Sequence, residues 1–465
     1  MSRQKQLVKN TVVISIGRFS AQAIALLLFP LYTLYLTPQQ LGFVDLVITY
    51  IMLLAPVVTI QMEMAAFRFL VDTREDEASK REVISNILHI VLTLTVALVL
   101  VFGIGSRFVA ISYAALVLGN ICAVIIGNLF LQIARGLGDN RRFAIASGLS
   151  GLTMLIITSV LLVGLKAGVS GVLYAMMLAN VVSALYLFIA LKLYRYVDLS
   201  VRSGELKKKL VSYSLPLVPN GLSWWVISVS DRTIITLSLG LAANGIYAVA
   251  SKYAAIFSSL FFIFSMAFTE SASMHIKAKD SDKFLSETNS ASLRLFGSLG
   301  LLLIAGAPII FSLLVGKNFQ GALQYVPVLI VAAFFNAMVG IYSAIYVAKK
   351  MTKQVATTSI AAAVINVVLT LVGIRYFGIW AAAGATAVAY AAMVVFRHYD
   401  LKKYVSITYE RYLFVKLAAS YAVVICLFYL GGTLAVGTSI IIAALVAVLF
   451  NISIAKSLYK TARKR

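Results

Sequence analysis

The chain has 465 residues, of which 61% are hydrophobic and only 12% are charged, and its formal net charge is +23. Soluble domains carry about 45–50% apolar and about 25% charged residues, so this composition excludes an ordinary soluble protein. It indicates an all-α, polytopic integral membrane protein. A nucleic-acid binder is excluded as well, because the basic residues lie in short clusters between long apolar runs and not over a hydrated face.

Apolar stretches long enough to cross a bilayer as helices recur along the whole chain and predict about 14 transmembrane helices. The first stretch is too long for the core of a signal peptide and has no small-residue cleavage site beyond it, so we expect it to be retained. The expected spans are 11–36, 41–66, 83–105, 109–132, 143–165, 170–191, 211–239, 244–269, 292–315, 322–348, 355–374, 378–397, 412–431 and 436–455.

Basic residues are concentrated in every second connection between these spans. Thirty-two lie at the termini or in the even-numbered connections, and only Arg107, Lys166, Lys317 and Arg375 lie in the odd-numbered ones. By the positive-inside rule this asymmetry places both termini in the cytoplasm. No loop is long enough for a soluble catalytic domain, and the sequence lacks a nucleotide-binding P-loop and metal-ligand spacings. We therefore expect a transporter and no enzyme, with no cofactor and no metal.

Two pairs of segments indicate an internal repeat. Residues 34–50 resemble residues 237–253 with an offset of 203, and the segment at Gly168 resembles the segment at Gly378 with an offset of 210. Six spans separate each pair, so both halves enter the membrane from the same side and form two pseudo-symmetric six-helix lobes. The expected domains are an N-terminal lobe at 1–200, a C-terminal lobe at 201–405 and two additional C-terminal helices at 406–465.

Ionisable residues deep in the membrane are costly and usually face a hydrated cavity or a partner. In the first span Thr11, Ser15, Arg18 and Gln22 share one helical face, with Arg18 about 10 Å below the cytoplasmic end. We expect Arg18 to be a cavity cation and Gln22 to lie beside it. The alternative is that Arg18 extends back to the cytoplasmic interface.

The seventh span carries a second polar face that includes Asn220, Trp224 and Asp231. Asp231 and Lys252 of the next span lie at similar depth and are expected to pair, with Arg232 as a second cation nearby. This pair either faces a hydrated cavity or only locks two helices together. Trp224 either stacks on a sugar ring or anchors the helix at the interface.

Two further carboxylates lie in the second span. Glu63 is deep enough to pair with Arg18 or to take up a proton, which makes it a candidate for ion coupling. Asp45 lies about one turn from the outer surface and is expected at the outer rim. Together with Asp231, these residues are the expected sites of an ion pair or of a coupling ion.

Three long segments closely resemble polysaccharide exporters, Wzx-type O-antigen flippases and their relatives. The first is Phe29-Pro-Leu-Tyr-Thr-Leu-Tyr-Leu-Thr-Pro-Gln-Gln-Leu-Gly-Phe-Val-Asp-Leu46. The second runs from Pro216 through the Trp-Trp pair and Ser230-Asp231-Arg232 to Tyr253. The third joins Ile365-Asn366-Val-Val-Leu-Thr to the segment from Tyr376 to Thr386. The resemblance implies the multidrug, oligosaccharidyl-lipid and polysaccharide exporter superfamily, with two six-helix lobes around a central cavity.

Members of this type flip a polyprenyl-diphosphate-linked oligosaccharide across the bacterial cytoplasmic membrane, driven by a proton or sodium gradient. The resemblance implies the same substrate here, surrounding membrane lipid and a polymerase or ligase of the same pathway as a partner. Arg18, Arg232 and Lys252 would offset the diphosphate charge. The alternatives are a multidrug antiporter of the same superfamily, a flippase for a lipid-linked peptidoglycan precursor, and a non-transporting scaffold of a polysaccharide assembly complex.

Overall fold

The computed structural model describes residues 24, 26–198, 203–276, 278, 280–349, 351–406 and 411–462, and the regular structure among them is entirely helical. The expected all-α membrane architecture is confirmed. Twelve helical segments of this described part are long and apolar enough to cross a membrane. The shorter apolar helix Leu26–Tyr35 and helix α9 lie where two further spans are predicted, so the structure is consistent with fourteen.

The chain forms two compact units, Met1–Val229 (unit 1) and Ser230–Arg465 (unit 2). In unit 1, α7 packs against α5 and α6, while α2 packs against α5 and α7. Unit 1 contains α2 (Pro38–Val58), α3 (Met62–Asp72), α4 (Glu77–Gly105), α5 (Ala114–Gly136), α6 (Asn140–Thr158), a π-helical turn (Ser159–Gly164), α7 (Gly168–Ala190), α8 (Gly204–Ser214) and the first part of α9 (Leu217–Leu239).

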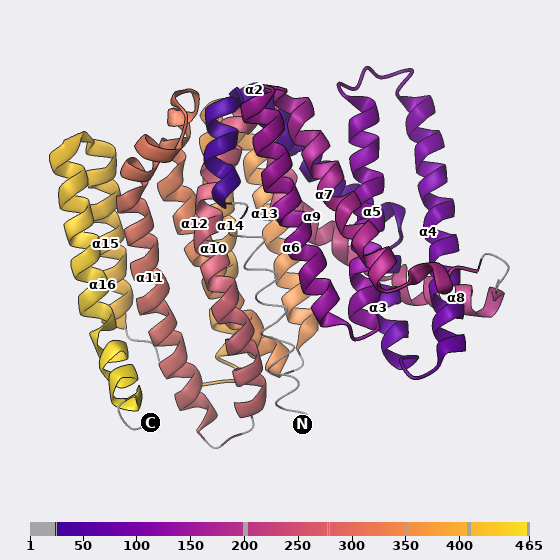
Figure 1. Ribbon diagram of the computed structural model, residues 1–465. Coiled ribbons are helices and arrows are strands. Elements are labelled where there is room, and N and C mark those ends of the chain that lie inside the picture. Colours follow the sequence, from indigo (N-terminus) through magenta and orange to yellow (C-terminus); the bar gives the residue numbers. More distant parts are fainter. Residues whose placement is uncertain are drawn as a thin grey trace. The chain divides into compact units, whose positions relative to one another are not determined.

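Unit 2 is organised around α12, which packs against α10, α11, α13 and α14. Helices α15 and α16 lie side by side and pack against α11 (Figure 1). Unit 2 contains the rest of α9, α10 (Leu241–His275), α11 (Ser281–Leu314), α12 (Val326–Ala348), α13 (Thr352–Phe377), α14 (Ile379–Leu401), α15 (Arg411–Leu430) and α16 (Gly432–Ala462). The domain boundaries at 200 and 405 stay predictions.

Helix starts follow the local sequence. Thr37 caps α2 by a reciprocal capping box: its hydroxyl accepts a hydrogen bond from the Gln40 backbone N–H, and the Gln40 side chain accepts one from the Thr37 N–H. Pro38 occupies the first turn, where no intrahelical donor is needed. Asp76 caps α4 by accepting from the Ala78 N–H.

The predicted uninterrupted span over 41–66 is wrong, because the chain breaks between α2 and α3. Ile60 and Gln61 adopt left-handed backbone conformations with φ of 46° and 59°, which an α-helix of L-residues excludes. Pro56 lies just before this break, inside α2, and has no N–H to donate within the helix. Glu63 consequently lies in the first turn of a separate helix, α3.

The predicted span over 211–239 is also divided. Helix α8 ends at Ser214 and α9 begins at Leu217, with Pro216 between them. Leu206, Leu210 and Ser214 fall on one face of α8 and are at least half-buried, whereas Lys208 and Lys209 are exposed. Helix α8 runs across the lower ends of α3 and α4, on which it packs (Figure 1).

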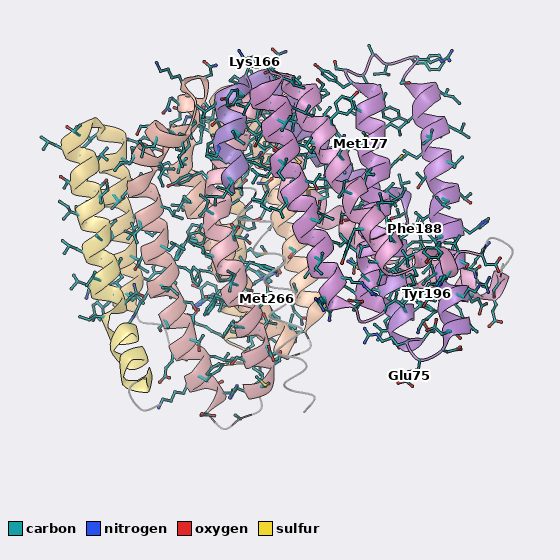
Figure 2. All side chains as sticks on the ribbon, in the orientation of Figure 1. Glu75, Lys166, Met177, Phe188, Tyr196 and Met266 are labelled. Carbon is teal, nitrogen blue, oxygen red and sulfur yellow. The ribbon has the colours of Figure 1, made fainter. Side chains whose placement is uncertain are left out.

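The two glycines of the predicted repeat adopt the same backbone conformation. Gly168 opens α7 with φ of +57°, and Gly378 precedes α14 with φ of +56°. This left-handed conformation favours glycine, so each unit uses the same residue type to begin the equivalent helix. Figure 2 shows Lys166, beside the first of these turns, at the opposite end of unit 1 from Glu75 and Tyr196. That separation matches the predicted alternation of connections across the membrane.

Helix α15 docks on α11 at two glycines. The Tyr421 hydroxyl donates a hydrogen bond to the Gly297 carbonyl (3.1 Å). A Cβ at Gly297 would meet the Leu417 side chain, and a Cβ at Gly300 would overlap the Tyr421 hydroxyl. The absence of side chains at these two positions therefore makes room for α15.

Candidate functional site

Asp231 is a buried carboxylate at the centre of a polar cluster in unit 2. It is 7% exposed and lies on α9 beside Arg232, whose Nη1 atom is 3.9 Å from Asp231 Oδ1. The Arg232 backbone N–H also donates to Oδ1 (3.0 Å). From the next helix, α10, the Tyr247 hydroxyl donates a hydrogen bond to Oδ2 of Asp231. Both carboxylate oxygens therefore have a defined partner.

Two residues of α13 and α14 extend this cluster. The Thr386 side chain of α14 lies close to the Tyr247 hydroxyl. The Asn366 side chain of α13 donates to the Thr386 hydroxyl (3.0 Å), which itself donates to the Ala382 carbonyl (2.9 Å). We define the Asp231 cluster as Asp231, Tyr247, Asn366 and Thr386. It joins four helices through polar side chains inside an apolar helix bundle.

Two buried hydroxyls adjoin the residues of the cluster along the chain. Thr370 lies one turn after Asn366 on α13, and Thr233 lies two residues after Asp231 on α9. Among the described residues, neither hydroxyl has a hydrogen-bond partner. Buried polar groups without partners are uncommon in native proteins. A carboxylate, an amide and hydroxyls supply the oxygen donors that a hard cation prefers, and the carboxylate alone can take up a proton.

The predicted substrate residues of the first span and of α9 are only partly placed. Arg18 and Gln22 lie outside the described residues, as do the side chains of Asn220 and Trp224, whose backbones belong to α9. Lys252 lies on α10, five residues after Tyr247, and its side chain is partly buried. Its expected pairing with Asp231 stays a prediction.

Trp225, the residue after Trp224, attaches the first part of α9 to α2 within unit 1. The Trp225 indole N–H donates to the Thr49 carbonyl of α2 (2.8 Å). In addition, a Cβ on Gly221 of α9 would overlap the Gln61 side chain at the break between α2 and α3. The first part of α9 is thus held on unit 1 by one indole hydrogen bond and one glycine contact.

The two carboxylates of α2 and α3 have different surroundings in unit 1. Asp45 is buried, with 6% of its surface exposed, and its expected position at the outer rim stays a prediction. Glu63 Oε2 accepts a hydrogen bond from the Thr59 hydroxyl (2.8 Å) at the start of α3. A carboxylate in the first helical turn is favourable because it faces the positive end of the helix dipole. This contact gives Glu63 a local structural role beside the predicted one in ion coupling.

Sequence reasoning missed Arg397, Asn366 and Thr386 as site residues. Arg397 is counted with the cytoplasmic connections in the sequence, yet it is completely buried inside unit 2. Asn366 and Thr386 belong to the segments that carry the family resemblance, and that signal could have identified them. Their positions on neighbouring helices α13 and α14 bring them together at 3.0 Å.

A separate open hollow of about 430 Å³ lies against the C-terminal half of α10 and includes Met266 in its lining; Figure 2 labels that residue on α10. Its lining is Ser265, Met266, Thr269, Glu270 and Ser273. Glu270 is exposed there, as expected for a residue near the membrane interface. Among the residues that the structure describes, α10 alone supplies this lining.

Comparison with known proteins places this geometry in context. Residues 7–269 match the family described as polysaccharide biosynthesis protein. No curated protein matches the chain in sequence. Among solved structures, the lipid II flippase MurJ in an inward closed conformation aligns with a TM-score of 0.70 and 16% identity, covering 96% of this chain and 100% of that chain.

Two other structures share the fold. A multidrug resistance MATE family transporter of the MOP superfamily, in an inward-facing conformation, aligns with a TM-score of 0.63 and 17% identity over 84% of this chain and 98% of that chain. A MOP superfamily transporter from Pyrococcus furiosus, described as having a binding pocket of reversed polarity, aligns with a TM-score of 0.57 and 17% identity over 85% and 95%. The fold that the sequence resemblance implies, that of the multidrug, oligosaccharidyl-lipid and polysaccharide exporter superfamily, is confirmed.

Proposed function

The chain belongs to the family of polysaccharide biosynthesis proteins, and from this premise we propose that it flips a polyprenyl-diphosphate-linked oligosaccharide across the bacterial cytoplasmic membrane. The observation that carries the proposal is the family match combined with a fold shared along the whole length of a lipid II flippase. The transported repeat unit would serve surface polysaccharide synthesis, such as O-antigen, capsule or exopolysaccharide. A polymerase or ligase would then consume it.

The chemistry of such a substrate explains the basic residues within the membrane. The diphosphate must leave water during transport, and guanidinium and ammonium groups would offset that cost. Arg18, Arg232 and Lys252 are the proposed cations, while Gln22, Asn220 and Trp224 are proposed to contact the sugars. The polyprenyl tail stays in lipid, so only the polar head group crosses the protein.

The Asp231 cluster is the proposed site of ion coupling. A buried carboxylate with a tyrosine, an asparagine and a threonine nearby offers oxygen atoms to a sodium ion, and the carboxylate can instead bind a proton. The buried hydroxyl of Thr370, one turn after Asn366 on α13, has no hydrogen-bond partner among the described residues and supports an additional ligand in this region. Asp45 and Glu63 are the corresponding candidates in unit 1.

Reconstitution tests this function directly. Purified protein in vesicles would be supplied with a fluorescent polyprenyl-diphosphate glycan on one side, and its movement would be followed by quenching under a sodium or a proton gradient. We expect gradient-dependent flipping that Asp231→Asn makes independent of the gradient. A multidrug antiporter is the competing function because MATE transporters share the fold. Gradient-driven export of a cationic dye without movement of the glycan would establish it instead.

A further inference from the structure

Arg397 of α14 is a fully buried arginine whose hydrogen bonds reach two neighbouring helices. Toward α13, its Nε atom donates to the Thr358 hydroxyl (3.0 Å). One Nη2 hydrogen bond goes to the Val355 carbonyl and another to the Ser359 hydroxyl, each 3.3 Å long. The side chain is 0% exposed, so solvent satisfies none of its donors.

Toward α12, the same guanidinium donates from Nη1 to the Val339 carbonyl (3.1 Å) and to the Ser343 hydroxyl. A guanidinium has five N–H donors in a rigid planar arrangement, and five hydrogen bonds are present. The five acceptors lie on two helices other than that of Arg397. Lysine has three donors on one atom and could not reproduce this planar set.

The acceptors around Arg397 are neutral. Among the described residues no carboxylate lies within salt-bridge distance of it. The Tyr346 ring lies 5.8 Å from the guanidinium carbon, and the Tyr346 hydroxyl donates to Asp400 Oδ2 (2.7 Å). A buried charge held without an ion pair is costly, so its retention calls for a role that a hydrophobic side chain could not fill.

Two of the helices that Arg397 joins, α13 and α14, also carry Asn366 and Thr386 of the Asp231 cluster. Thr358 and Asn366 are eight residues apart on α13, about 12 Å along the helix, and Thr386 and Arg397 are eleven residues apart on α14, about 16 Å. The two helices therefore meet at two polar contacts, Arg397–Thr358 and Asn366–Thr386. Both contacts depend on the same register between α13 and α14.

We propose that Arg397 is a positioning residue that fixes the register of α13 against α14, and thereby holds Asn366 and Thr386 beside Tyr247 and Asp231. The inference rests on the proposed function to the extent that the Asp231 cluster couples an ion to flipping. Arg397 itself touches neither ion nor substrate. Its role is to keep the coupling site assembled.

The first experiment measures the register without reference to transport. Val364 of α13 and Val388 of α14 are exposed and lie two residues from Asn366 and Thr386. After replacement of Cys122 and Cys426 by serine, spin labels at Val364→Cys and Val388→Cys report the distance between the helices by electron paramagnetic resonance. We expect a narrow distribution of spin-label distances in the otherwise unchanged chain, and a broader or shifted distribution in Arg397→Gln. Lys402→Gln, which removes an exposed cation at the end of the same helix, is the matched control.

The second experiment measures flipping of the fluorescent polyprenyl-diphosphate glycan against the concentration of the ion that drives the unsubstituted protein. Substitution of a residue that holds the ligands of a bound metal ion in place weakens ion binding by roughly ten- to a hundredfold. We therefore expect Arg397→Gln to raise the half-saturating ion concentration about tenfold, with half-saturation by the glycan unchanged. Arg397→Lys should rescue neither readout, because it lacks the planar donors.

The milder variant Thr358→Val removes one hydrogen-bond acceptor of Arg397 and keeps the volume of the side chain. It provides the same test if Arg397→Gln does not fold. It should change both readouts in the same direction by a smaller amount. Unchanged spin-label distances together with an unchanged ion dependence in folded variants would overturn the positioning role. If the unsubstituted protein flips no glycan while Arg397→Gln alters the distances, the proposed function fails and the positioning of α13 against α14 stands.

Discussion

Tyr247 donates a hydrogen bond from its hydroxyl to the carboxylate of Asp231, and this contact joins α9 to α10 inside unit 2. Both side chains are nearly completely buried. Hydrogen bonds to a buried charged group contribute more than neutral ones, and leaving the charge unpartnered is costly. The contact therefore provides a direct way to test whether Asp231 is a functional group or only a structural one.

We expect substitutions of Asp231 and of Tyr247 to change the gradient dependence of flipping differently. Asp231→Asn removes the charge that binds the coupling ion, so flipping should lose its dependence on the sodium or proton gradient. Tyr247→Phe removes one donor and keeps the charge, so flipping should slow by roughly tenfold, equivalent to about 1.4 kcal/mol, while staying gradient-dependent. Flipping rates in vesicles with and without the gradient measure both. Full gradient dependence in Asp231→Asn would show that the carboxylate has only a structural role.

The proposed cavity cations give a second prediction. The substitutions Arg232→Gln and Lys252→Gln each remove a positive charge. Each should reduce the rate of flipping at least tenfold, because the diphosphate loses a compensating charge. Lys317→Gln is the control, since it removes an exposed cation from a connection between spans. The glycan-quenching assay compares the three variants at equal protein amounts. Equal rates in Arg232→Gln, Lys252→Gln and the control would contradict a positively charged path for the diphosphate.

A third prediction concerns the docking of α15 on α11. Gly300→Ala places a Cβ against the Tyr421 hydroxyl, and overpacking of this kind costs about 1–3 kcal/mol. We expect a lower melting temperature in detergent, partly restored by Tyr421→Phe, which removes the overlapping atom. Gly306→Ala on the same helix meets nothing within 4 Å and should leave the melting temperature unchanged or raised. An undiminished melting temperature in Gly300→Ala would show that α15 does not dock as described.

Asp76 gives a prediction about pH at the surface. Hydrogen bonds from the Ser79 hydroxyl and from nearby backbone N–H groups lower the pKa of Asp76 below its ordinary value of 3.8. A carboxylate with a lowered pKa in the folded state stabilises it above the unfolded pKa, and this stabilisation is lost as the pH falls through the folded pKa.

Asp76→Asn keeps a capping side chain but does not titrate. Melting temperatures between pH 7 and pH 3 should therefore decline slightly more steeply in the unsubstituted protein than in Asp76→Asn. Parallel declines in the two proteins would show that the cap does not titrate in this range.

The helical architecture was predictable because hydrocarbon imposes it. Backbone groups in lipid must be satisfied within a helix, so apolar length and basic connections located the spans from the sequence. The breaks were not predictable in the same way. Ile60 and Gln61 have ordinary apolar and polar side chains, and nothing in their composition indicates the left-handed backbone that separates α2 from α3.

The candidate site was predictable only in part. Asp231 stood out because an acidic residue within an apolar run is costly. Tyr247, Asn366 and Thr386 did not, since uncharged polar residues are common in membrane helices and the cluster depends on the packing of α10, α13 and α14. Arg397 was hidden for a different reason: it lies among basic residues at a span end, and only its contacts distinguish a buried guanidinium from a charge in the connection.

The flipping of a lipid-linked glycan is tested most directly by deleting the protein and quantifying polyprenyl-diphosphate oligosaccharides by mass spectrometry, with surface glycan measured in parallel. We expect a complete repeat unit to accumulate on its lipid carrier while surface glycan is lost, and the unsubstituted protein to reverse both changes. Unchanged lipid-linked intermediates and intact surface glycan in the deletion strain would show that the protein does not flip this lipid-linked glycan.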